Sequence, residues 1–168
     1  MSFDTVITCH ANADNDAIAA LVGALLLYPD AVLLYPGSQE RQLQEFYDEA
    51  VEPLYPCIGL RDVDAESVKR LVLVDGHHPG RFAHVRSLLG RDDVEVHIWD
   101  HHPLSEDDDD KGRMVVERAA FSCIEKVGST CTLIVEEIRR RGLELTCEFA
   151  TSLAAGIYGD CRFVKPDV

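Results

Sequence analysis

The chain lacks several features that mark other classes of protein. No apolar run reaches the roughly 20 residues that span a bilayer, and no basic segment precedes an apolar one at the N-terminus. We therefore expect neither a membrane span nor a signal peptide, and we expect a cytoplasmic protein. Basic residues are also scarce, because 16 Lys and Arg stand against 30 Asp and Glu and give a net charge of −14. This balance disfavours binding of nucleic acid through a broad basic face, so an anionic substrate needs help from bound divalent cations or from a basic neighbouring domain.

Closely spaced cysteines are absent as well. The six cysteines are scattered without a C-x-x-C pair, at Cys9, Cys57, Cys123, Cys131, Cys147 and Cys161. Disulfide frameworks and thiolate zinc sites normally show closer pairing, so we predict reduced thiols within the core.

The length of 168 residues and the 46% hydrophobic content predict one domain with a substantial core. Strands are predicted at 3–9, 31–35, 71–74, 94–99 and 113–117. Helices are predicted at 17–28, 38–50, 79–90, 129–141 and 146–158, with a short helix beginning at Asp64. No internal repeat or linker interrupts this alternation. We therefore predict an α/β fold with a mainly parallel sheet and helices on both faces.

Aspartate and histidine residues stand where the apolar elements end. They lie in four segments, His10-x-x-x-Asp14-x-Asp16, Asp75, Asp100-His101-His102 and Asp160. The carboxyl ends of parallel strands lie side by side, so residues far apart in sequence converge there. Clustered carboxylates repel one another unless a cation holds them. Several Asp with a few His are the ligands expected for a pair of divalent ions that share one carboxylate.

Each of these residues also has a purely structural explanation. Asp14 and Asp16 could cap the helix that follows them. Asp75 could close a turn, and His101 or His102 could be a core histidine with satisfied hydrogen bonds. Their joint occurrence at matching element ends favours the metal site.

Five segments, in order, resemble the motifs of the DHH phosphoesterases. His10-Ala-Asn12-Ala-Asp14-Asn-Asp16-Ala17 resembles the first motif, H-x-N-x-D-x-D-A, and Asp100-His101-His102 matches the triplet that gives the family its name. Asp75 with Arg81 is similar to D-T-x-x-x-x-R, Gly128-Ser129-Thr130 to G-[SA]-T, and the segment from Gly156 to Asp160 to G-I-x-x-D. The chain departs from the pattern at Gly76, where the family has Thr or Ser, and at Cys161-Arg162, where it commonly has Thr-Gly.

The resemblance implies a two-metal phosphoesterase in which a metal-bound hydroxide attacks phosphorus. One ion would be held by His10, Asp14 and Asp75, and the other by Asp16, Asp75, His101 and Asp160, with Asp75 as the bridge. The catalytic set would be His102 facing the substrate phosphate, together with Asp75 and Arg81. Mixed imidazole and carboxylate ligands favour Mn²⁺, with Mg²⁺ as the alternative.

Further residues near the motifs receive supporting or alternative roles. Asp100 and Asn12 would support the ligands from outside the coordination sphere. Gly128, Ser129 and Thr130 could bind phosphate at a helix N-terminus or simply cap that helix. Arg81 could contact phosphate or pair with an acid of the site.

Two other segments have open interpretations. His77 and His78 are predicted to be exposed loop residues, although they could donate to substrate or bind metal. The acidic run 106–110 is predicted to be a solvated loop rather than a cation site.

A narrower resemblance concerns the context of the domain. The segments 27–29, 36–40, 99–103 and 128–132 resemble the N-terminal DHH domain of large bacterial proteins that continue with CBS domains and a poly(A) polymerase or tRNA nucleotidyltransferase module. We therefore expect 1–168 to be a single DHH domain at the start of a longer protein, with the downstream domains of that polypeptide as its partners.

Two functions follow from this context. The domain could hydrolyse a phosphodiester or nucleotide phosphate in RNA or tRNA processing, with a nucleotide or short single-stranded RNA or DNA as substrate. Alternatively, it could be a non-catalytic module that binds nucleotide or RNA, or regulates the nucleotidyltransferase.

Overall fold

The computed structural model describes residues 3–39, 44, 47–104 and 110–161. Within these residues the strands form one parallel sheet. Its five strands lie in the order β2-β1-β3-β4-β5, and every hydrogen-bonded pair is parallel. The strands are β1 (Thr5–Cys9), β2 (Val32–Leu34), β3 (Arg70–Val74), β4 (Glu95–Asp100) and β5 (Phe121–Ile124). The predicted α/β class with a mainly parallel sheet is confirmed.

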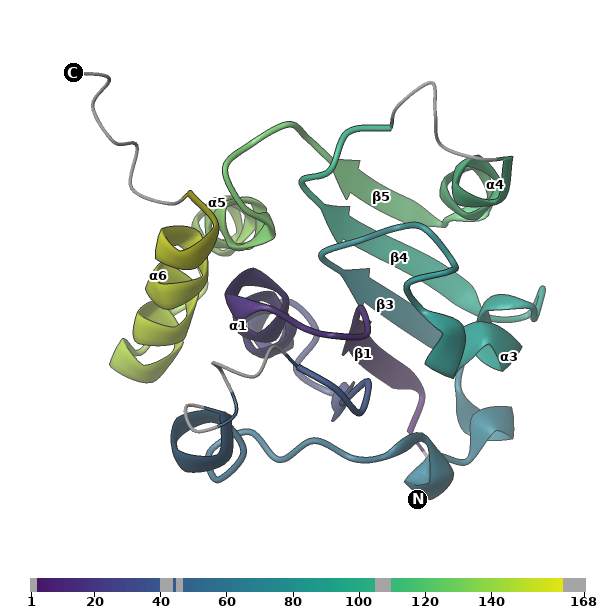
Figure 1. Ribbon diagram of the computed structural model, residues 1–168, viewed down its shortest axis with the longest axis horizontal. Coiled ribbons are helices and arrows are strands. Elements are labelled where there is room, and N and C mark those ends of the chain that lie inside the picture. The colour runs from purple at the N-terminus through teal and green to yellow at the C-terminus, as the bar shows by residue number, and fades with distance from the viewer. Residues whose placement is uncertain (1–2, 40–43, 45–46, 105–109, 162–168) are drawn as a thin grey trace.

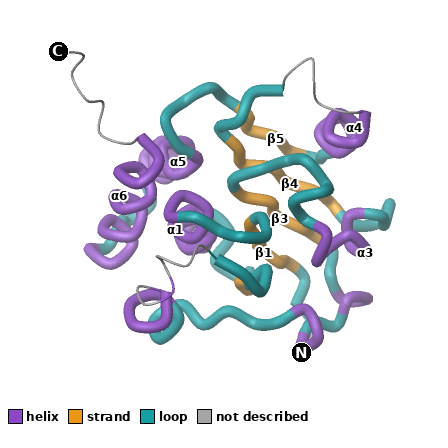
Figure 2. Tube along the Cα trace, in the orientation of Figure 1, coloured by secondary structure: helices purple, strands orange, loops and turns teal. Residues whose placement is uncertain are grey.

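Helices cover both faces of this sheet (Figure 1, Figure 2). One side carries α1 (Asn15–Gly23), α5 (Thr130–Arg141) and α6 (Cys147–Cys161), and the other carries α3 (Arg86–Leu89) and α4 (Asp110–Arg118). Short helical turns lie at Ala24–Leu26, Tyr47–Val51, Leu60–Asp62, Ala65–Ser67 and Ala83–Val85. Within the described ranges, no helix is both long enough and apolar enough to cross a membrane.

The sheet separates two hydrophobic cores. Along β1, Ile7 packs into the core shared with α1, α5 and α6, whereas its neighbour Val6 packs into the core that contains Phe82 and Val115. Successive side chains of a strand point to opposite faces. The strands therefore read as continuous apolar runs in the sequence because both faces of the sheet are buried.

The strand order places the candidate site at a defined edge of the sheet. The chain passes from β1 to β2 on one side, and the remaining strands lie on the other side, so the order reverses between β1 and β3. Open α/β sheets bind ligands outside the carboxyl ends of the strands at such a point. His10 directly follows β1, Asp75 directly follows β3, and Asp100 is the last residue of β4.

Close packing of α6 brings Asp160 to this edge. A Cβ atom added at Gly156 would lie 2.6 Å from the Cys131 Sγ atom and 2.7 Å from the Ala19 Cβ atom. Helix α6 therefore approaches α1 and α5 at a position that only glycine permits, one helical turn before Asp160.

The predicted strand 113–117 is wrong, because these residues belong to α4. Gly112, Val115, Val116 and Ala119 are the buried or half-buried positions, and this spacing is helical rather than alternating. The true fifth strand, β5, was not predicted. It is a short edge strand with an exposed Ser122 at its centre, so its sequence contains no continuous apolar run.

Other predicted elements agree only in part with the structure. Much of the predicted helix 38–50 lies outside the described residues, as does 105–109 in the acidic run. The Ser38 Oγ atom accepts a hydrogen bond from the Asn12 amide at 2.8 Å, and its predicted role as a helix cap concerns residues that lie outside the described ranges. The short helix after Asp64 is confirmed, and the Asp64 side chain caps it.

All six cysteines are unpaired thiols, as predicted. Their placement in the core is confirmed for Cys9 and Cys131, which are buried. It is wrong for Cys147 and Cys161, which are exposed at the two ends of α6.

Substitution of Gly156 tests the packing of α6. We expect Gly156→Ala to lower the free energy of unfolding by roughly 1–3 kcal/mol, because the new methyl group overlaps Cys131 and Ala19. Gly90→Ala is the matched control, since Gly90 has a φ of −85° and the added Cβ would lie 3.4 Å from its closest neighbour. Urea denaturation followed by the fluorescence of Trp99 measures both. Equal stability of the two variants would contradict the packing argument.

Candidate metal centre

Three overlapping groups of acid and imidazole side chains lie at the carboxyl edge of the sheet. They are His10, Asp14 and Asp75; Asp16, His101 and Asp160; and Asp75, His101 and His102. Within each group the candidate ligand atoms lie within 4.8 Å of one another. The fold thus brings together all six residues predicted to bind metal, and His102 joins them. Asp75 and His101 each belong to two groups.

Asp75 is the buried centre of the cluster, with only 1% of its surface exposed. Its backbone has a φ of 59°, in the left-handed region that Asp tolerates better than most residues, and its amide donates to the Trp99 carbonyl at 2.9 Å. One carboxylate oxygen, Oδ2, lies 3.1 Å from His10 Nε2, and the other accepts from the Thr130 hydroxyl at 3.0 Å. The turn after β3 therefore aims this carboxylate between the other groups.

The two acids at the start of α1 have different roles. Asp14 does cap the helix, since its Oδ1 atom accepts from the Ala17 amide at 3.0 Å, and it also contributes an atom to the first group. Asp16 is not the cap. It is 1% exposed and accepts from the amides of Thr130 at 2.6 Å and Cys131 at 3.1 Å. The capping explanation therefore holds for Asp14 only.

The N-terminus of α5 is already used by side chains of the protein. Asp16 accepts from its first two amides, and the Ser129 Oγ atom accepts from the Thr132 amide at 3.2 Å. These are the amides on which phosphate binding by Gly128, Ser129 and Thr130 would depend. In this structure the segment caps α5 and fixes Asp16 instead.

Backbone carbonyls orient the two candidate imidazole ligands. His10 Nδ1 lies 2.8 Å from the Ala11 carbonyl, and His101 Nδ1 lies 3.1 Å from the Val127 carbonyl. A carbonyl can only accept, so each Nδ1 donates to its carbonyl, and this fixes the ring with Nε2 directed at the carboxylates. The Nε2 atom of His101 lies 3.3 Å from Asp160 and 3.5 Å from Asp75. Histidines that ligate metals are typically held in this way.

Asp100 supports His102 rather than His101. Its Oδ1 atom accepts from the His102 amide at 3.1 Å and lies 2.7 Å from His102 Nδ1. Its Oδ2 atom lies 2.6 Å from Nδ1 of His77. His77 is only 5% exposed, so its prediction as an exposed loop residue is wrong. His78 is half-buried, and its Nδ1 atom accepts from the Gly80 amide at 3.1 Å.

Arg81 and Asn12 lie at the rim of the cluster. The Arg81 side chain is exposed, and its carbonyl accepts from the Ala11 amide at 3.0 Å, which ties the two loops together. Asn12 is exposed with a φ of 58°, and its amide donates to Ser38. Both side chains are thus on the solvent side of the site, where Arg81 could contact a phosphate. No described contact joins the Asn12 side chain to a candidate ligand, so its supporting role stays a prediction.

The electrostatics of the cluster reflect its crowded acids. Burial and the neighbouring Asp75 raise the pKa of Asp16 to about 6, and burial raises the pKa of Asp160. For Asp75, burial is outweighed by the hydrogen bond and charge of His10, and its pKa is lowered. A divalent cation would stabilise the ionised form of all three groups. The grouped ligand atoms are carboxylate oxygens and imidazole nitrogens, which fit such an ion.

A second electrostatic unit lies beside it. Burial opposes ionisation of Asp100, but hydrogen bonds from His102 and His77 lower its pKa to about 2. In return, the hydrogen bond to Asp100 raises the pKa of His102. The contact with Asp100 therefore favours the protonated form of His102, at the exposed end of the cluster.

Comparison with known proteins gives the family. Residues 4–157 match the family model described as the DHH family, N-terminal domain. The chain belongs to the DHH family. In this DHH domain, the residues that resemble the family motifs are those that converge at the edge of the sheet.

Relatives of this DHH domain include much longer proteins. It is 39% identical over 155 residues to the A-adding tRNA nucleotidyltransferase of Geobacter sulfurreducens and 32% identical over 162 residues to that of Aquifex aeolicus. Each alignment covers 92% of this chain but only 17% and 16% of the relatives, respectively. The chain thus spans about a sixth of their length.

Two other similar proteins carry phosphate-related names. A probable manganese-dependent inorganic pyrophosphatase of Lactobacillus delbrueckii subsp. bulgaricus is 26% identical, over 93% of this chain and 47% of that protein. The crystal structure of an exopolyphosphatase-related protein from Bacteroides fragilis has a TM-score of 0.65 at 18% identity, over 95% of this chain and 46% of the other. The latter likeness shows that the two share a fold.

Three contacts within the DHH site, made by two residues, were not predicted. Thr130 donates its hydroxyl to Asp75 as well as its amide to Asp16, and His77 bonds to Asp100. For Thr130 the sequence offers only its place in a helix cap. For His77 the only signal in the sequence is its position two residues after Asp75. The adjacent His78 has nearly the same position, so the sequence does not show which of the two histidines points inward.

The raised pKa of Asp16 predicts a pH-dependent stability in metal-free buffer. A carboxyl with a pKa near 3.8 in the unfolded chain and about 6 in the folded chain stabilises the fold fully below pH 4 and loses this contribution as the pH rises through 6. Asn does not titrate, so the stability of Asp16→Asn relative to wild type should increase between pH 4 and pH 7, by up to roughly 3 kcal/mol. Denaturant titrations in EDTA measure this difference. A difference that is independent of pH would contradict the assignment.

Proposed function

We propose that this DHH domain is a metal-dependent phosphoesterase that hydrolyses a phosphodiester or a nucleotide phosphate with two divalent cations. The observation that carries the proposal is the buried Asp75 carboxylate, which faces His10 with one oxygen and His101 with the other. A single carboxylate between two further sets of acid and imidazole ligands is the arrangement expected at a two-metal site.

The ligand assignment follows from these distances. His10, Asp14 and Asp75 would hold one ion, and Asp16, His101 and Asp160 would hold the other together with Asp75. When bound, the pair supplies charge that lowers the pKa of water and offsets the charge of a phosphate. The imidazole donors favour Mn²⁺ over Mg²⁺.

The residues of the chain would perform three further tasks. Asp100 holds Nδ1 of His102, so that Nε2 of the protonated ring is the atom available to donate to a phosphate oxygen. The exposed guanidinium of Arg81 adds positive charge on the same side, as its effect on the pKa of His102 indicates. Thr130 and Cys131 fix Asp16 through their amides, so the site is organised before a ligand binds.

The likeness to A-adding tRNA nucleotidyltransferases suggests where such a domain works. We infer a role in RNA or tRNA processing, on a nucleotide or a short single-stranded RNA or DNA, beside downstream domains of the same polypeptide. The alternative is a non-catalytic module that binds nucleotide or RNA or regulates the transferase. The likeness to nucleotidyltransferases, in which another activity is named for the whole protein, motivates this alternative.

Metal content and hydrolysis test the proposal directly. Wild type dialysed against Mn²⁺ should retain bound metal by elemental analysis and should hydrolyse short RNA or a generic phosphodiester. Asp75→Asn should lose most of the metal and the activity, because it removes the shared carboxylate. Asp92→Asn, an exposed Asp at the other end of the sheet, makes the same charge change and should behave as wild type.

Two results separate the alternatives. Wild type that binds no Mn²⁺ even at millimolar concentration would contradict the metal site. Metal binding without hydrolysis, found also in the longer polypeptide, would favour the non-catalytic module.

Substitutions in the Asp100-His101-His102 triplet should differ in their effects on metal content and turnover. His101→Ala should lower metal content, because His101 Nε2 lies between Asp75 and Asp160. His102→Ala should retain metal and lose turnover, because Nδ1 of His102 is already held by Asp100. Asp100→Asn should lower activity about 10- to 100-fold with metal retained, because the native Asp100 orients His102 through its Nδ1 atom. Circular dichroism checks that each variant folds. Equal loss of metal in all three variants would rule out this division of roles.

A further inference from the structure

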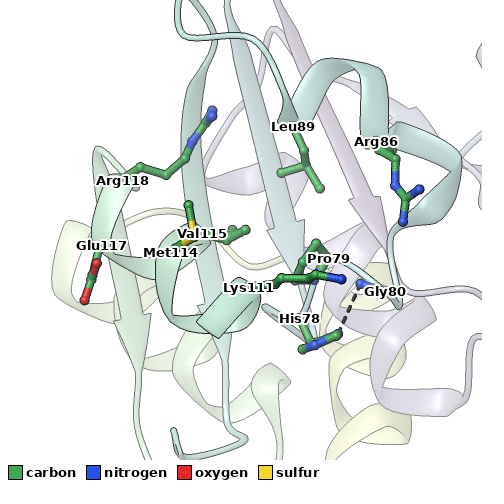
Figure 3. A pocket seen from close by; sticks show the side chains of 10 residues that line it. All are labelled: His78, Pro79, Gly80, Arg86, Leu89, Lys111, Met114, Val115, Glu117 and Arg118. Carbon is green, nitrogen blue, oxygen red and sulfur yellow. Dashed lines mark hydrogen bonds between the residues drawn. The ribbon is translucent and has the colours of Figure 1, made fainter. Parts of the chain in front are cut away.

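A separate hollow lies between α3 and α4, which cover the face of the sheet opposite α1 (Figure 1). Figure 3 shows the residues that line it. Its volume is about 780 Å³, which is within the range of small-molecule sites in proteins. None of the candidate metal ligands lines it. The hollow is nevertheless connected to the metal centre through one loop, because His78 lines it and the preceding residue, His77, bonds to Asp100.

The charge of this hollow is opposite to that of the chain. Acids outnumber bases by 30 to 16 in the whole sequence, but Arg86, Lys111 and Arg118 line the hollow with one acid, Glu117. The gathering of basic side chains in a concave site gives a local positive potential that attracts anions.

Several basic side chains elsewhere in the described chain pair with carboxylates. Arg70 pairs with Glu95 at 2.9 Å, and Arg140 and Arg141 both pair with Glu137. Arg118 differs, because its Nη2 atom donates to the backbone carbonyls of residues 91 and 94. Its positive charge is fixed in place by groups that do not neutralise it.

Two of the basic side chains converge on one turn. Figure 3 shows Lys111 of α4 and Arg86 of α3 pointing toward the Pro79–Gly80 turn from different sides. His78 closes the turn by accepting the Gly80 amide at 3.1 Å. A phosphate group placed at this turn would be within reach of an ammonium and a guanidinium, the two side chains best suited to bind it.

The rest of the hollow is apolar. Leu89 and Val115 form a wall in which they are only 7% and 8% exposed, and Met114 is 63% exposed at the rim. Methionine adapts to flat ligands because its side chain is flexible and polarizable. A ligand for this site therefore has an anionic end and a flat, weakly polar body.

We propose that this hollow is a nucleotide-binding site, which takes a nucleoside monophosphate either free or as the 5′ end of a short RNA strand. The phosphate lies at the Pro79–Gly80 turn between Lys111 and Arg86, and the base lies against Met114 and the Leu89–Val115 wall. The site is distinct from the metal centre and does not require that the centre hydrolyses anything.

Calorimetry with the full 168-residue chain in EDTA tests the proposal. AMP should bind more tightly than either adenosine or inorganic phosphate, because each of these lacks one half of the recognised chemistry. Arg86→Gln should weaken AMP binding about 10- to 100-fold, as loss of a charged hydrogen bond predicts. Arg139→Gln removes the same charge from an exposed position on α5 and should leave binding unchanged.

Further variants separate the parts of the site. Met114→Glu places a carboxylate where the nucleobase would lie, and it should also weaken the binding of AMP. Because Met114 is already exposed, the change should not disturb the fold. The dinucleotide pApA distinguishes the two sources of ligand: competition with AMP indicates a strand end, and failure to compete indicates a free nucleotide. Both results support the site.

Three results would overturn the proposal. They are no AMP binding by wild type, equal weakening by Arg86→Gln and Arg139→Gln, and inorganic phosphate binding as tightly as AMP. The Asp75→Asn variant keeps these outcomes independent of the proposed hydrolysis, since it should lose metal and still bind AMP through the hollow.

Discussion

The structure depends on one constraint, which is that several ionisable groups must lie together, largely buried, at the carboxyl edge of a parallel sheet. Asp75 is nearly inaccessible, and burial together with the charge of this close neighbour raises the pKa of Asp16 to about 6. Burial of like charges is unfavourable unless hydrogen bonds or a cation compensate. The surrounding elements provide the hydrogen bonds: α5 donates two amides to Asp16, and Thr130 and His10 contact Asp75.

Two packing features keep this edge in place. The sheet is buried on both faces by separate cores, so the ends of β1, β3 and β4 are fixed relative to one another. The contact at Gly156 then sets α6 against α1 and α5, and it carries Asp160 to within 3.3 Å of His101. Asp160 of α6 thereby completes a group whose other members are Asp16 of α1 and His101, the residue directly after β4.

The basic hollow extends this organisation to the other face of the sheet. The loop after β3 carries Asp75 to the metal centre, His77 to Asp100, and His78 to the hollow. One loop therefore contributes to both candidate sites. In an acidic chain, positive charge from bound metal at the edge of the sheet and from basic side chains between α3 and α4 would offset the repulsion of an anionic phosphate ligand.

Much of this arrangement was determined by the sequence alone, because it depends on local patterns. Continuous apolar runs predicted four of the five strands, and the acids and histidines at their ends indicated where a site would form. The sequence did not show that 113–117 is a helix, that His77 is buried against Asp100, or that Thr130 joins Asp16 to Asp75, because each depends on which face packs against distant elements. The basic hollow was decided in the same way, since Arg86 and Lys111 are far apart in sequence and only the packing of α3 and α4 places them at one turn. Local sequence patterns determine the strands and the acids and histidines at their ends, whereas the tertiary structure determines which charged groups converge across the sheet.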